Sequence, residues 1–534
     1  MHEALPGVSR RRFLQSVGVS GGAGALFATM GALGLAPAAA APAPPFQAPR
    51  RSDFTLTGRV ARRVVILGGG IAGLATAYEL GKAGYDCTIL EARGVAGGRN
   101  FTVRGGTAET DLDGHTQRAG YSPGVYFNAG PARIAQWMVT LDYCRELGVP
   151  VQPFINANAD ALIYNEAAGM PPGQPVRYRT AKADVYGYVS ELLAKATDQG
   201  ALDARLTAED KDRLLAFLQN FGAIGGRDAG WAYAGSSRRG FASYPGAGND
   251  AGTPLDGPPP LADVFASNVG RTFSFEFGYD QAMLMFQPVG GMDRIPAALS
   301  RAIGPGRIRL GAEVAALTDR ADGVEVTYRQ QGRTRTIRAD FCVAALPPHL
   351  MARIPHNLGA GVQAALASFP VTASGKIGLE YRSRWWENDL RIYGGITETD
   401  LDLAHVWYPS FDFHAARGLI VGYYNTGAAA RAYGALTPEQ RALRAVEQGV
   451  KIHGEKYRTE LAASFSIAWH RTRYLEGAWT SPPYGTPGYD LLLAPAGRVH
   501  FAGDWLSHEV AWQHGAFVSA RAAVTALHER VMAH

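Results

Sequence analysis

The pattern of apolar and polar residues is most regular between residues 63 and 100. The apolar run Val64 to Leu67 predicts a buried strand of a parallel sheet, and the run CTIL predicts a second strand that ends on Glu91. A helix is predicted between them, with its apolar positions at helical spacing, at Leu74, Ala77, Tyr78 and Leu80. Strand, helix and strand in this order predict a βαβ unit and therefore an α/β fold.

Three glycines, Gly68, Gly70 and Gly73, stand between the first strand and the helix at GxGxxG spacing. The first permits a tight turn, the second lets the backbone approach a pyrophosphate, and the third lets the helix pack closely on the strand. The helix N-terminus offers free N–H groups to phosphates. Glu91, at the end of the second strand, is placed to accept hydrogen bonds from a ribose. The unit is therefore predicted to bind a dinucleotide.

Further segments of the predicted dinucleotide-binding domain occur late in the chain. An alternating meander is predicted over 311–348, with turns at Asp322–Gly323 and Gln331–Gly332, and it closes on a buried strand over 341–346. A last helix is predicted from about Ala511 to the end. One domain is therefore assembled from separated segments.

The intervening regions have other patterns. Residues 156–225 are predicted to be helical, with Thr207 as an N-cap and with a core-facing stripe formed by Val185, Val189 and Leu192. Residues 351–490 mix strands such as KIGLEY and GLIVGYYN with Pro/Gly loops. We interpret this last region as a substrate-binding sheet.

A second glycine-rich motif follows the ribose acid directly. The run ARGVAGGRNFTVR contains Arg93, Gly97, Gly98, Arg99, Thr102 and Arg104. This arrangement resembles the signature of the flavin amine oxidase superfamily, which includes monoamine, polyamine and L-amino-acid oxidases. The resemblance implies FAD as the cofactor, and it implies a discontinuous Rossmann-type FAD-binding domain, an α+β substrate-binding domain and a helical insertion. In that family the arginine at the Arg99 position contacts the flavin diphosphate region.

The run FAGDWLSHEVAWQHGAF near the C-terminus resembles the last flavin segment of the same family. The acid at the Asp504 position holds the ribityl chain there, and most members have Glu. The helix near Trp512 would direct its N–H groups at the flavin N1–C2=O edge, where its dipole favours negative charge. The resemblance as a whole implies a cofactor set of Gly68, Gly70, Ile71, Ala72, Gly73, Glu91, Ala92, Arg93, Gly98, Arg99, Gly130, Pro131, Ala132, Arg133, Val314, Gly503, Asp504, Trp512, Gln513 and Ala516.

Lys376, Arg133, Tyr423 and Trp512 are predicted to be catalytic, and Ala511 is predicted to bind substrate. Lys376 matches the family lysine that holds a water against flavin N5, and a desolvated lysine there would have a lowered pKa. Arg133, in YFNAGPARI, resembles the arginine that clamps the substrate carboxylate of L-amino-acid oxidases, and a guanidinium suits two parallel bonds to a carboxylate. The resemblance also assigns Tyr423 to the carboxylate, Trp512 to the aromatic wall and the Ala511 carbonyl to the α-amino group.

These residues predict an oxidase that converts L-amino acids to 2-oxo acids, ammonia and hydrogen peroxide by hydride transfer from Cα to flavin N5. A monoamine or polyamine oxidase and an amino-acid 2-monooxygenase are the alternatives on the same scaffold. A flavin-bearing electron-transfer partner is a further alternative from a different class.

The predicted domain boundaries follow from these segments. They assign 1–41 to a signal peptide, 42–58 to a linker, 59–125, 286–350 and 494–534 to the FAD-binding domain, 126–155, 231–285 and 351–493 to the substrate domain, and 156–230 to the helical domain.

The N-terminus predicts export. SRRRFLQ precedes an apolar, Gly/Ala-rich run over 17–35 and the small-residue stretch APAAAAPAPP, which is the organisation of a signal peptide. It resembles a twin-arginine signal with Arg10 and Arg11 as the pair, which would carry a folded, FAD-loaded protein to the periplasm or outside the cell. A retained membrane anchor is the alternative.

The composition bears on the number of domains and on the kinds of partner and site, but it does not predict a function. The chain of 534 residues exceeds the usual size of one core, and its net charge of +5 comes from scattered arginines, so no nucleic-acid partner is predicted. The cysteines, Cys87, Cys144 and Cys342, give no disulfide framework, and no metal-ligand spacing is visible. A homodimer is expected from the family resemblance alone.

Overall fold

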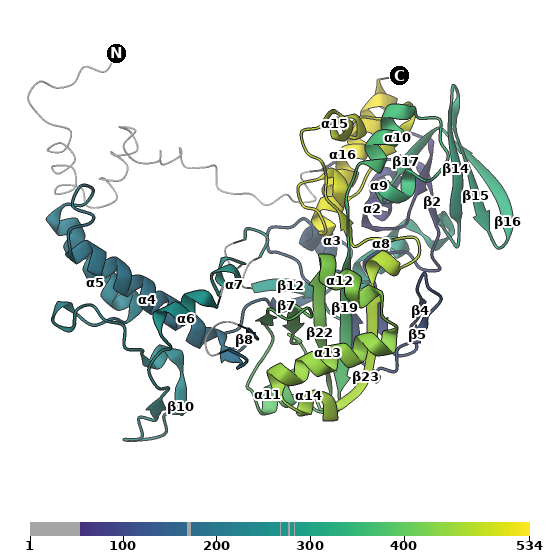
Figure 1. The fold of residues 1–534 in the computed structure, drawn as a ribbon. Coiled ribbons are helices and arrows are strands. Elements are labelled where there is room, and N and C mark those ends of the chain that lie inside the picture. The colour runs from purple at the N-terminus through teal and green to yellow at the C-terminus, as the bar shows by residue number, and fades with distance from the viewer. Residues whose placement is uncertain (1–53, 168–171, 268, 276–277, 282–283, 534) are drawn as a thin grey trace, which may run out of the picture. The chain divides into compact units, whose positions relative to one another are not determined.

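A computed structural model of the chain describes residues 54–167, 172–267, 269–275, 278–281 and 284–533, and Figure 1 shows their elements. The predicted signal peptide and most of the predicted linker lie outside this range. Within it, no helix combines the length and the apolar character that a membrane span needs.

The predicted βαβ unit lies at the centre of a parallel sheet. Helix α2 (Ile71–Lys82) connects its first two strands, and every strand pairing is parallel. In spatial order the strands are β13 (Ile308–Leu310), β2 (Asp86–Glu91), β1 (Arg63–Leu67), β17 (Phe341–Ala344) and β25 (Val499–Phe501). Strands from three distant stretches thus form one sheet, and the predicted α/β fold class is confirmed.

Both faces of this sheet are buried, which explains the continuous apolar run of β1. Val64 and Ile66 face one hydrophobic core, and Val65 and Leu67 face another. The first core is formed with α2, α3 (Thr140–Glu146), α8 (Arg294–Ile303) and α16 (Gln513–Met532). The second is formed with α9 (Pro348–Met351), α10 (Ala360–Ala367), α15 (Pro487–Leu493) and the meander.

The predicted meander is present as three antiparallel strands, β14 (Glu313–Arg320), β15 (Gly323–Gln330) and β16 (Arg333–Ala339). The second turn is the predicted Gln331–Gly332, and both residues have positive φ, of 51° and 72°. The first turn is Ala321–Asp322, one residue earlier than predicted, because Gly323 already pairs with Arg320.

A second sheet is built from the region that the sequence assigns to substrate binding. Its strands are β23 (Leu461–Ala468), β19 (Ser374–Tyr381), β22 (Gly418–Thr426), β21 (His405–Trp407), β20 (Ile396–Thr399), β8 (Leu162–Tyr164) and β9 (Val176–Arg177), in this spatial order. Only the β20–β8 pairing is parallel among these. Helices beside this sheet are α11 (Trp385–Asn388), α12 (Gly427–Gly434), α13 (Pro438–His453) and α14 (Lys456–Thr459).

The helical prediction for residues 156–225 is wrong in its first part. Residues 162–164 and 176–177 are strands, because they pair with the edge of the second sheet. The helices are α4 (Tyr178–Asp198) and α5 (Ala208–Gly222), followed by α6 (Leu261–Ala266) and α7 (Val269–Phe275). The predicted N-cap is confirmed: Thr207 forms a capping box with Asp210.

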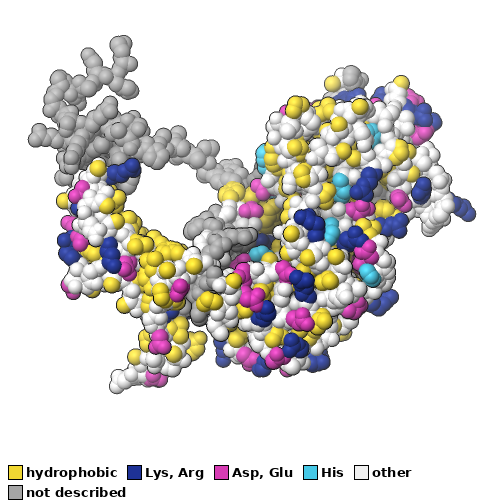
Figure 2. All heavy atoms as spheres, viewed as in Figure 1, with side chains coloured by type: hydrophobic (Ala, Val, Ile, Leu, Met, Phe, Trp, Pro, Cys, Tyr) yellow, Lys and Arg dark blue, Asp and Glu magenta, His cyan; other side chains and the backbone are white. Residues whose placement is uncertain are grey.

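The stripe on α4 does not face the core as predicted. Val189 and Leu192 are 43% and 48% exposed, and only Val185 packs against buried residues. A different face of α4 is buried because Gly187 lets the ring of Tyr233 approach closely; a Cβ at position 187 would lie 2.3 Å from that ring. Figure 2 shows hydrophobic side chains on the surface of α4 to α6, and the exposed ones are Val189, Leu192, Leu193, Phe217, Phe221 and Phe265.

Short strand pairs complete the described elements. They are β3 (Thr102–Arg104) with β6 (Tyr126–Asn128), β4 (Ala108–Thr110) with β5 (Thr116–Arg118), β7 (Val151–Ile155) with β12 (Leu284–Pro288), β10 (Phe241–Ser243) with β11 (Thr253–Pro254), and β18 (Val371–Thr372) with β24 (Trp479–Thr480). Since residues 51–534 form a single unit by their contacts, the predicted domain boundaries inside it stay predictions.

Candidate active site

A cavity of about 820 Å³ opens at the carboxyl ends of β1 and β2, where ligands of open α/β sheets bind. Every predicted cofactor residue except Gly73 lines it. These lining residues are Gly68, Gly70, Ile71, Ala72, Glu91, Ala92, Arg93, Gly98, Arg99, Gly130, Pro131, Ala132, Arg133, Val314, Gly503, Asp504, Trp512, Gln513 and Ala516. The cavity therefore brings together segments from both ends of the chain.

The glycines of the first turn have the geometry that a phosphate cradle needs. Gly68 has a φ of +98°, which favours glycine. A Cβ at Gly73 would lie 2.0 Å from the carbonyl oxygen of Gly68, so the helix sits against the turn without room for a side chain. A Cβ at Gly70 would meet no atom within 4 Å, because it would project into the open cavity. Space is thus kept clear at the N-terminus of α2.

Glu91 is held rigidly at the end of β2. Its Oε2 accepts a hydrogen bond from Gly69 N at 2.7 Å, and its Oε1 accepts one from Arg93 N at 2.7 Å. Burial raises the pKa of this carboxyl, while the two backbone bonds act in the opposite direction. Each oxygen keeps lone-pair capacity toward the cavity, which suits two ribose hydroxyls.

The C-terminal segment closes the other side of the cradle. Asp504 forms an ion pair with Arg99 and accepts a hydrogen bond from Ala511 N at 2.9 Å. Helix α16 then begins at Gln513, whose Nε2 donates to Asn100 Oδ1 at 2.8 Å. Among the described residues, Gln513 Oε1 and Trp505 Nε1 are buried without a hydrogen-bond partner. Both residues line the cavity, so these two atoms are available to a polar ligand bound there.

Lys376 lies on β19 and lines the cavity together with Arg133, Trp407 and Tyr424. We call the part of the cavity that these four residues line its substrate end. It is 4% exposed, and its Nζ donates to the carbonyl oxygen of Gly130 at 2.5 Å. The ammonium lies 4.7 Å from the ring centroids of both Trp407 and Tyr424. Burial, and then the charge of Arg133, lower its pKa to about 7. The amine is therefore half-protonated near neutral pH.

Arg133 lies beside this lysine. It is 8% exposed, its Nη2 donates to Gln281 Oε1 at 2.8 Å, and its guanidinium lies 4.8 Å from the centroid of the Trp407 ring. Burial lowers the pKa of the guanidinium. The Arg133 guanidinium and the Lys376 amine therefore both lie over one indole, an arrangement that favours an anionic ligand between or beside them.

Comparison with known proteins identifies the family of the chain. A sequence model of the family described as flavin containing amine oxidoreductase matches residues 71–528. This chain belongs to that family. Its glycine cradle, its ribose acid and the unpartnered polar atoms beside α16 fit FAD, the cofactor of the family. Residues of α2, β2 and the start of α16 would hold it.

Curated relatives and solved structures extend the comparison. The chain is 27% identical over 465 residues to an L-amino-acid oxidase from Pseudechis australis, with 84% of each chain covered. It is 26% identical over 472 residues to a putative L-amino-acid oxidase, YobN, from Bacillus subtilis strain 168, covering 86% of this chain and 93% of the relative. The fold resembles that of cyclohexylamine oxidase from Brevibacterium oxydans, with a TM-score of 0.59, 18% identity, and coverage of 88% and 99%. It also resembles putrescine oxidase bound to putrescine, with a TM-score of 0.55, 19% identity, and coverage of 89% and 100%.

Besides Gly73, one predicted catalytic residue of this amine oxidoreductase lies outside the cavity. Tyr423 is fully buried in the core of the second sheet, where its ring packs against Tyr433 at a centroid distance of 4.5 Å. Its neighbour Tyr424 lines the cavity instead, because successive residues of β22 face opposite sides. The register between β19 and β22 distinguishes the two tyrosines. Tyr424 pairs directly with Lys376, whereas Tyr423 pairs with Ile377.

The structure also adds residues that sequence reasoning missed. Trp407, Trp469 and Gln281 line the cavity together with the predicted Ala511 and Trp512. They come from the short strand β21, from a 3-10 turn over Trp469–Arg471 and from a loop, and none of these sequences carries a flavin motif, so no local pattern identifies them.

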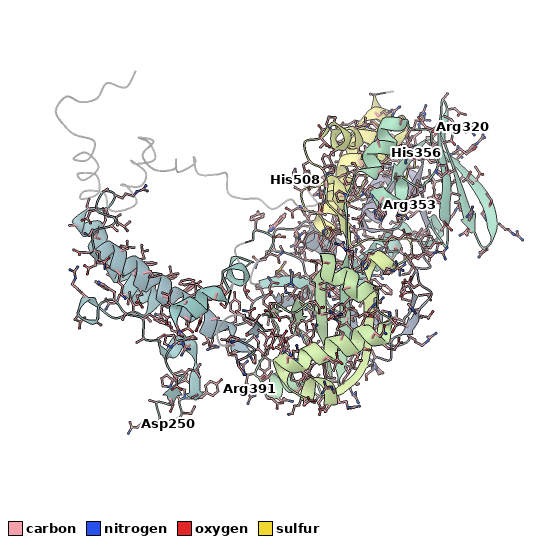
Figure 3. The ribbon with its side chains drawn as sticks, in the orientation of Figure 1. Asp250, Arg320, Arg353, His356, Arg391 and His508 are labelled. Carbon is pink, nitrogen blue, oxygen red and sulfur yellow. The ribbon has the colours of Figure 1, made fainter. Side chains whose placement is uncertain are left out.

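The opposite end of the cavity carries charged side chains. Arg353, which follows α9 and is labelled in Figure 3, lines the cavity and forms an ion pair with Glu476. Arg93 forms a further ion pair with Glu109 at 2.7 Å. Both arginines line the cavity.

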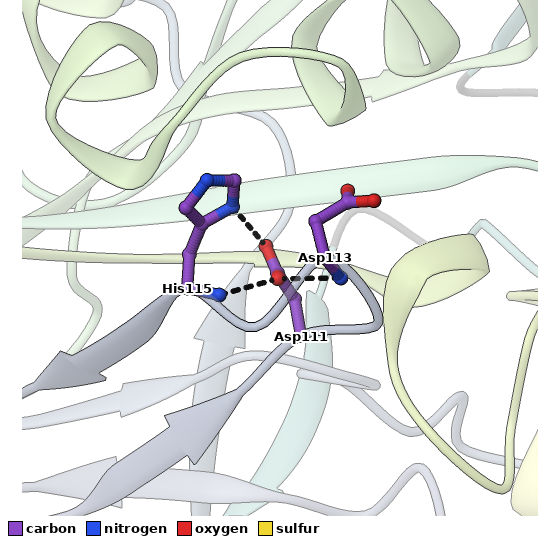
Figure 4. Close-up of side chains that lie close together, drawn as sticks. All are labelled: Asp111, Asp113 and His115. Atoms are coloured by element: carbon purple, nitrogen blue, oxygen red, sulfur yellow. Dashed lines mark hydrogen bonds and ion pairs between the residues drawn. The ribbon is translucent and has the colours of Figure 1, made fainter.

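A cluster of Asp111, Asp113 and His115 lies in the turn between β4 and β5 (Figure 4). Asp111 Oδ1 accepts hydrogen bonds from the backbone N–H groups of Asp113 and His115, both at 3.0 Å. Arg471 pairs with Asp113, and Arg441 lies 3.5 Å from Asp111. Because two arginines already compensate the carboxylates, we assign no metal to this turn.

The pKa of Lys376 predicts a pH-dependent stability. The amine has its ordinary pKa of 10.5 when unfolded and a pKa of about 7 when folded. Between these values the folded protein binds fewer protons than the unfolded chain, so stability rises with pH. We expect Lys376→Met to raise the melting temperature most below about pH 7, and the gain to vanish as pH approaches about 10.

Thermal unfolding of the variant and the wild type across this pH range measures the effect. Lys456→Met is the matched control, because the Lys456 side chain is 57% exposed in an ion pair with Asp389. A melting-temperature difference for Lys376→Met that does not change with pH would contradict the buried, poorly solvated amine.

Proposed function

We propose that this flavin amine oxidoreductase oxidises L-amino acids to imino acids, which hydrolyse to 2-oxo acids and ammonia while oxygen is reduced to hydrogen peroxide. The observation that carries this proposal is the buried Arg133, which lines the substrate end of the cavity next to Lys376. A guanidinium binds a carboxylate through two parallel hydrogen bonds and so fixes the orientation of Cα. A substrate without a carboxylate cannot form this pair of hydrogen bonds with Arg133.

Arg133 and Lys376 also influence the protonation of the substrate's α-amino group. Arg133 and Lys376 disfavour a protonated α-amino group nearby, and the rings of Trp407, Tyr424 and Trp512 exclude water. The amine would therefore bind neutral, with the Ala511 carbonyl as its acceptor. A neutral amine already has the lone pair that its oxidation needs, so no strong side-chain base is required.

Bound FAD supplies the acceptor for the two electrons. Lys376 would hold a water at the substrate face, and its partial protonation near neutral pH lets it donate to or accept from that water. Arg99, Asp504 and Glu91 would bind the cofactor without taking part in the chemistry.

A substrate panel tests the proposal directly. Purified holoenzyme is mixed with single L-amino acids, with their decarboxylated amines and with D-amino acids, and hydrogen peroxide and flavin absorbance are followed. We expect peroxide release and anaerobic loss of flavin absorbance with some L-amino acids and with neither control class. Turnover of the amines alone would show a monoamine or polyamine oxidase, the alternative that the likeness in fold to cyclohexylamine and putrescine oxidases favours. An amide product would show a monooxygenase.

Export and dimerisation are part of the same proposal. The N-terminal arginine pair and the Ala/Pro-rich stretch behind it support a twin-arginine signal and a periplasmic or secreted enzyme. The exposed apolar side chains of α4 and α5 support a homodimer, since a contiguous apolar surface is usually covered. Cell fractionation and light scattering of the purified protein test the two points.

A further inference from the structure

Gln281 is hydrogen-bonded to the guanidinium of Arg133, the group that is proposed to bind the substrate carboxylate. Its Oε1 accepts a hydrogen bond from Arg133 Nη2 at 2.8 Å, and its side chain lines the cavity. An amide oxygen is a neutral acceptor in the position where a carboxylate would bind more strongly, because hydrogen bonds between two charged groups are shorter and stronger. A carboxylate that takes two parallel bonds from Arg133, one of them from Nη2, would compete with Gln281 for that nitrogen.

The segment around Gln281, residues 278–281, also contacts the aromatic wall. Gln281 Nε2 donates to Asp280 Oδ2 at 3.0 Å, and the same oxygen accepts a hydrogen bond from Trp512 Nε1 at 3.1 Å. The carbonyl oxygen of Tyr279 accepts from Trp137 Nε1 at 3.1 Å. The amide that covers Arg133 is thus linked through Asp280 to the indole predicted to flank the substrate.

We propose that Gln281 is a positioning residue that holds the guanidinium of Arg133 in the ligand-free protein and is displaced by the substrate carboxylate. This inference rests on the proposed function, because it needs a carboxylate at Arg133. A neutral placeholder keeps the buried guanidinium hydrogen-bonded and oriented before substrate binds. Displacement lowers the apparent affinity by the strength of the bond that is broken. It also releases the Gln281 contact to Asp280 and so reaches Trp512.

Benzoate binding to the holoenzyme tests this without turnover. Calorimetric titration is carried out on the wild type and on Gln281→Leu, which removes the amide at similar size. We expect the variant to bind benzoate about 3- to 10-fold more tightly, the net contribution of one typical hydrogen bond. The KM of L-amino-acid substrates should fall by a similar factor, with a smaller change in kcat.

Gln281→Glu gives the opposite result under the same proposal. A carboxylate at this position would pair with Arg133, so benzoate binding should weaken by about 10- to 100-fold. The matched control is Gln136→Leu, since Gln136 is exposed and its side-chain amide donates to the carbonyl of Leu284 at 3.3 Å. Its benzoate affinity should equal that of the wild type.

Two results would overturn the inference. Weaker benzoate binding in Gln281→Leu would show that Gln281 is a ligand of the carboxylate rather than its competitor. Unchanged binding in both Gln281 variants, with binding lost in Arg133→Gln, would remove the inference and leave the proposed function intact. If the wild type and Arg133→Gln both fail to bind benzoate, the proposed carboxylate site fails and the inference fails with it.

Discussion

Arg133→Ala is expected to lower kcat/KM for L-amino acids by roughly 100- to 1,000-fold, because removing one partner of a buried, hydrogen-bonded charge pair costs about 2 to 5 kcal/mol. Arg133 is 8% exposed, so water does not readily replace its guanidinium. The loss should appear in KM and in kcat together, since the carboxylate bonds also orient Cα. Steady-state peroxide assays with L-leucine measure both constants.

Three comparisons make this expectation specific. Arg133→Lys keeps the charge but not the planar pair of donors, so its activity should lie between those of wild type and Arg133→Ala. Isoamylamine, which is leucine without its carboxylate, should be a poor substrate for the wild type and should not be impaired further by the alanine substitution. Arg145→Ala controls for loss of any arginine, because the Arg145 side chain is 79% exposed. Full activity of Arg133→Ala on L-leucine would exclude the carboxylate clamp.

Gly73→Ala is expected to abolish FAD binding. The new Cβ would lie 2.0 Å from the carbonyl oxygen of Gly68, which is a backbone atom and cannot rotate away. Helix α2 would have to move off β1, and its N-terminus would no longer face the phosphates. Overpacking of this kind costs about 1 to 3 kcal/mol or more. The measurements are the ratio of flavin to protein absorbance after purification and the melting temperature, both of which should fall.

Gly81→Ala is the matched control in the same helix. A Cβ at Gly81 would meet no atom within 4 Å, and α2 is helical there. Alanine should therefore retain FAD and stabilise the protein by about 0.5 to 1 kcal/mol. Normal flavin content in Gly73→Ala would show that the helix can shift without losing the cofactor, and the close-packing argument would fail.

Local patterns were sufficient where the chemistry lies in consecutive residues. The strand, glycine turn, helix and acid between Arg63 and Glu91 are neighbours in the sequence, so spacing alone predicts their geometry. The meander over 313–339 was predicted for the same reason, since alternation and a Gln-Gly turn are local signals. The prediction was wrong where a local pattern is compatible with both a helix and a strand. Residues 162–164 were predicted to be helical but form a strand, because they pair with the distant strand β20.

The choice between Tyr423 and Tyr424 shows the limit within the site. Both are aromatic, both are adjacent, and a strand places one on each face. Which of them faces Lys376 depends on the register between β19 and β22, and a bulge shifts that register between Ile377 and Gly378. A shift by one residue exchanges the two faces, and the side chains of one strand do not reveal it.

The sequence by itself determined the α/β class, the dinucleotide cradle and the family, because each depends on residues with fixed local spacing. The tertiary structure decided which side chains surround the substrate end: Tyr424 rather than Tyr423, with Trp407 and Gln281 added. Arg133 and Gln281 are separated by 148 positions and meet only after the chain has folded. Contacts at such separation depend on how sheets and loops pack, which no local periodicity encodes.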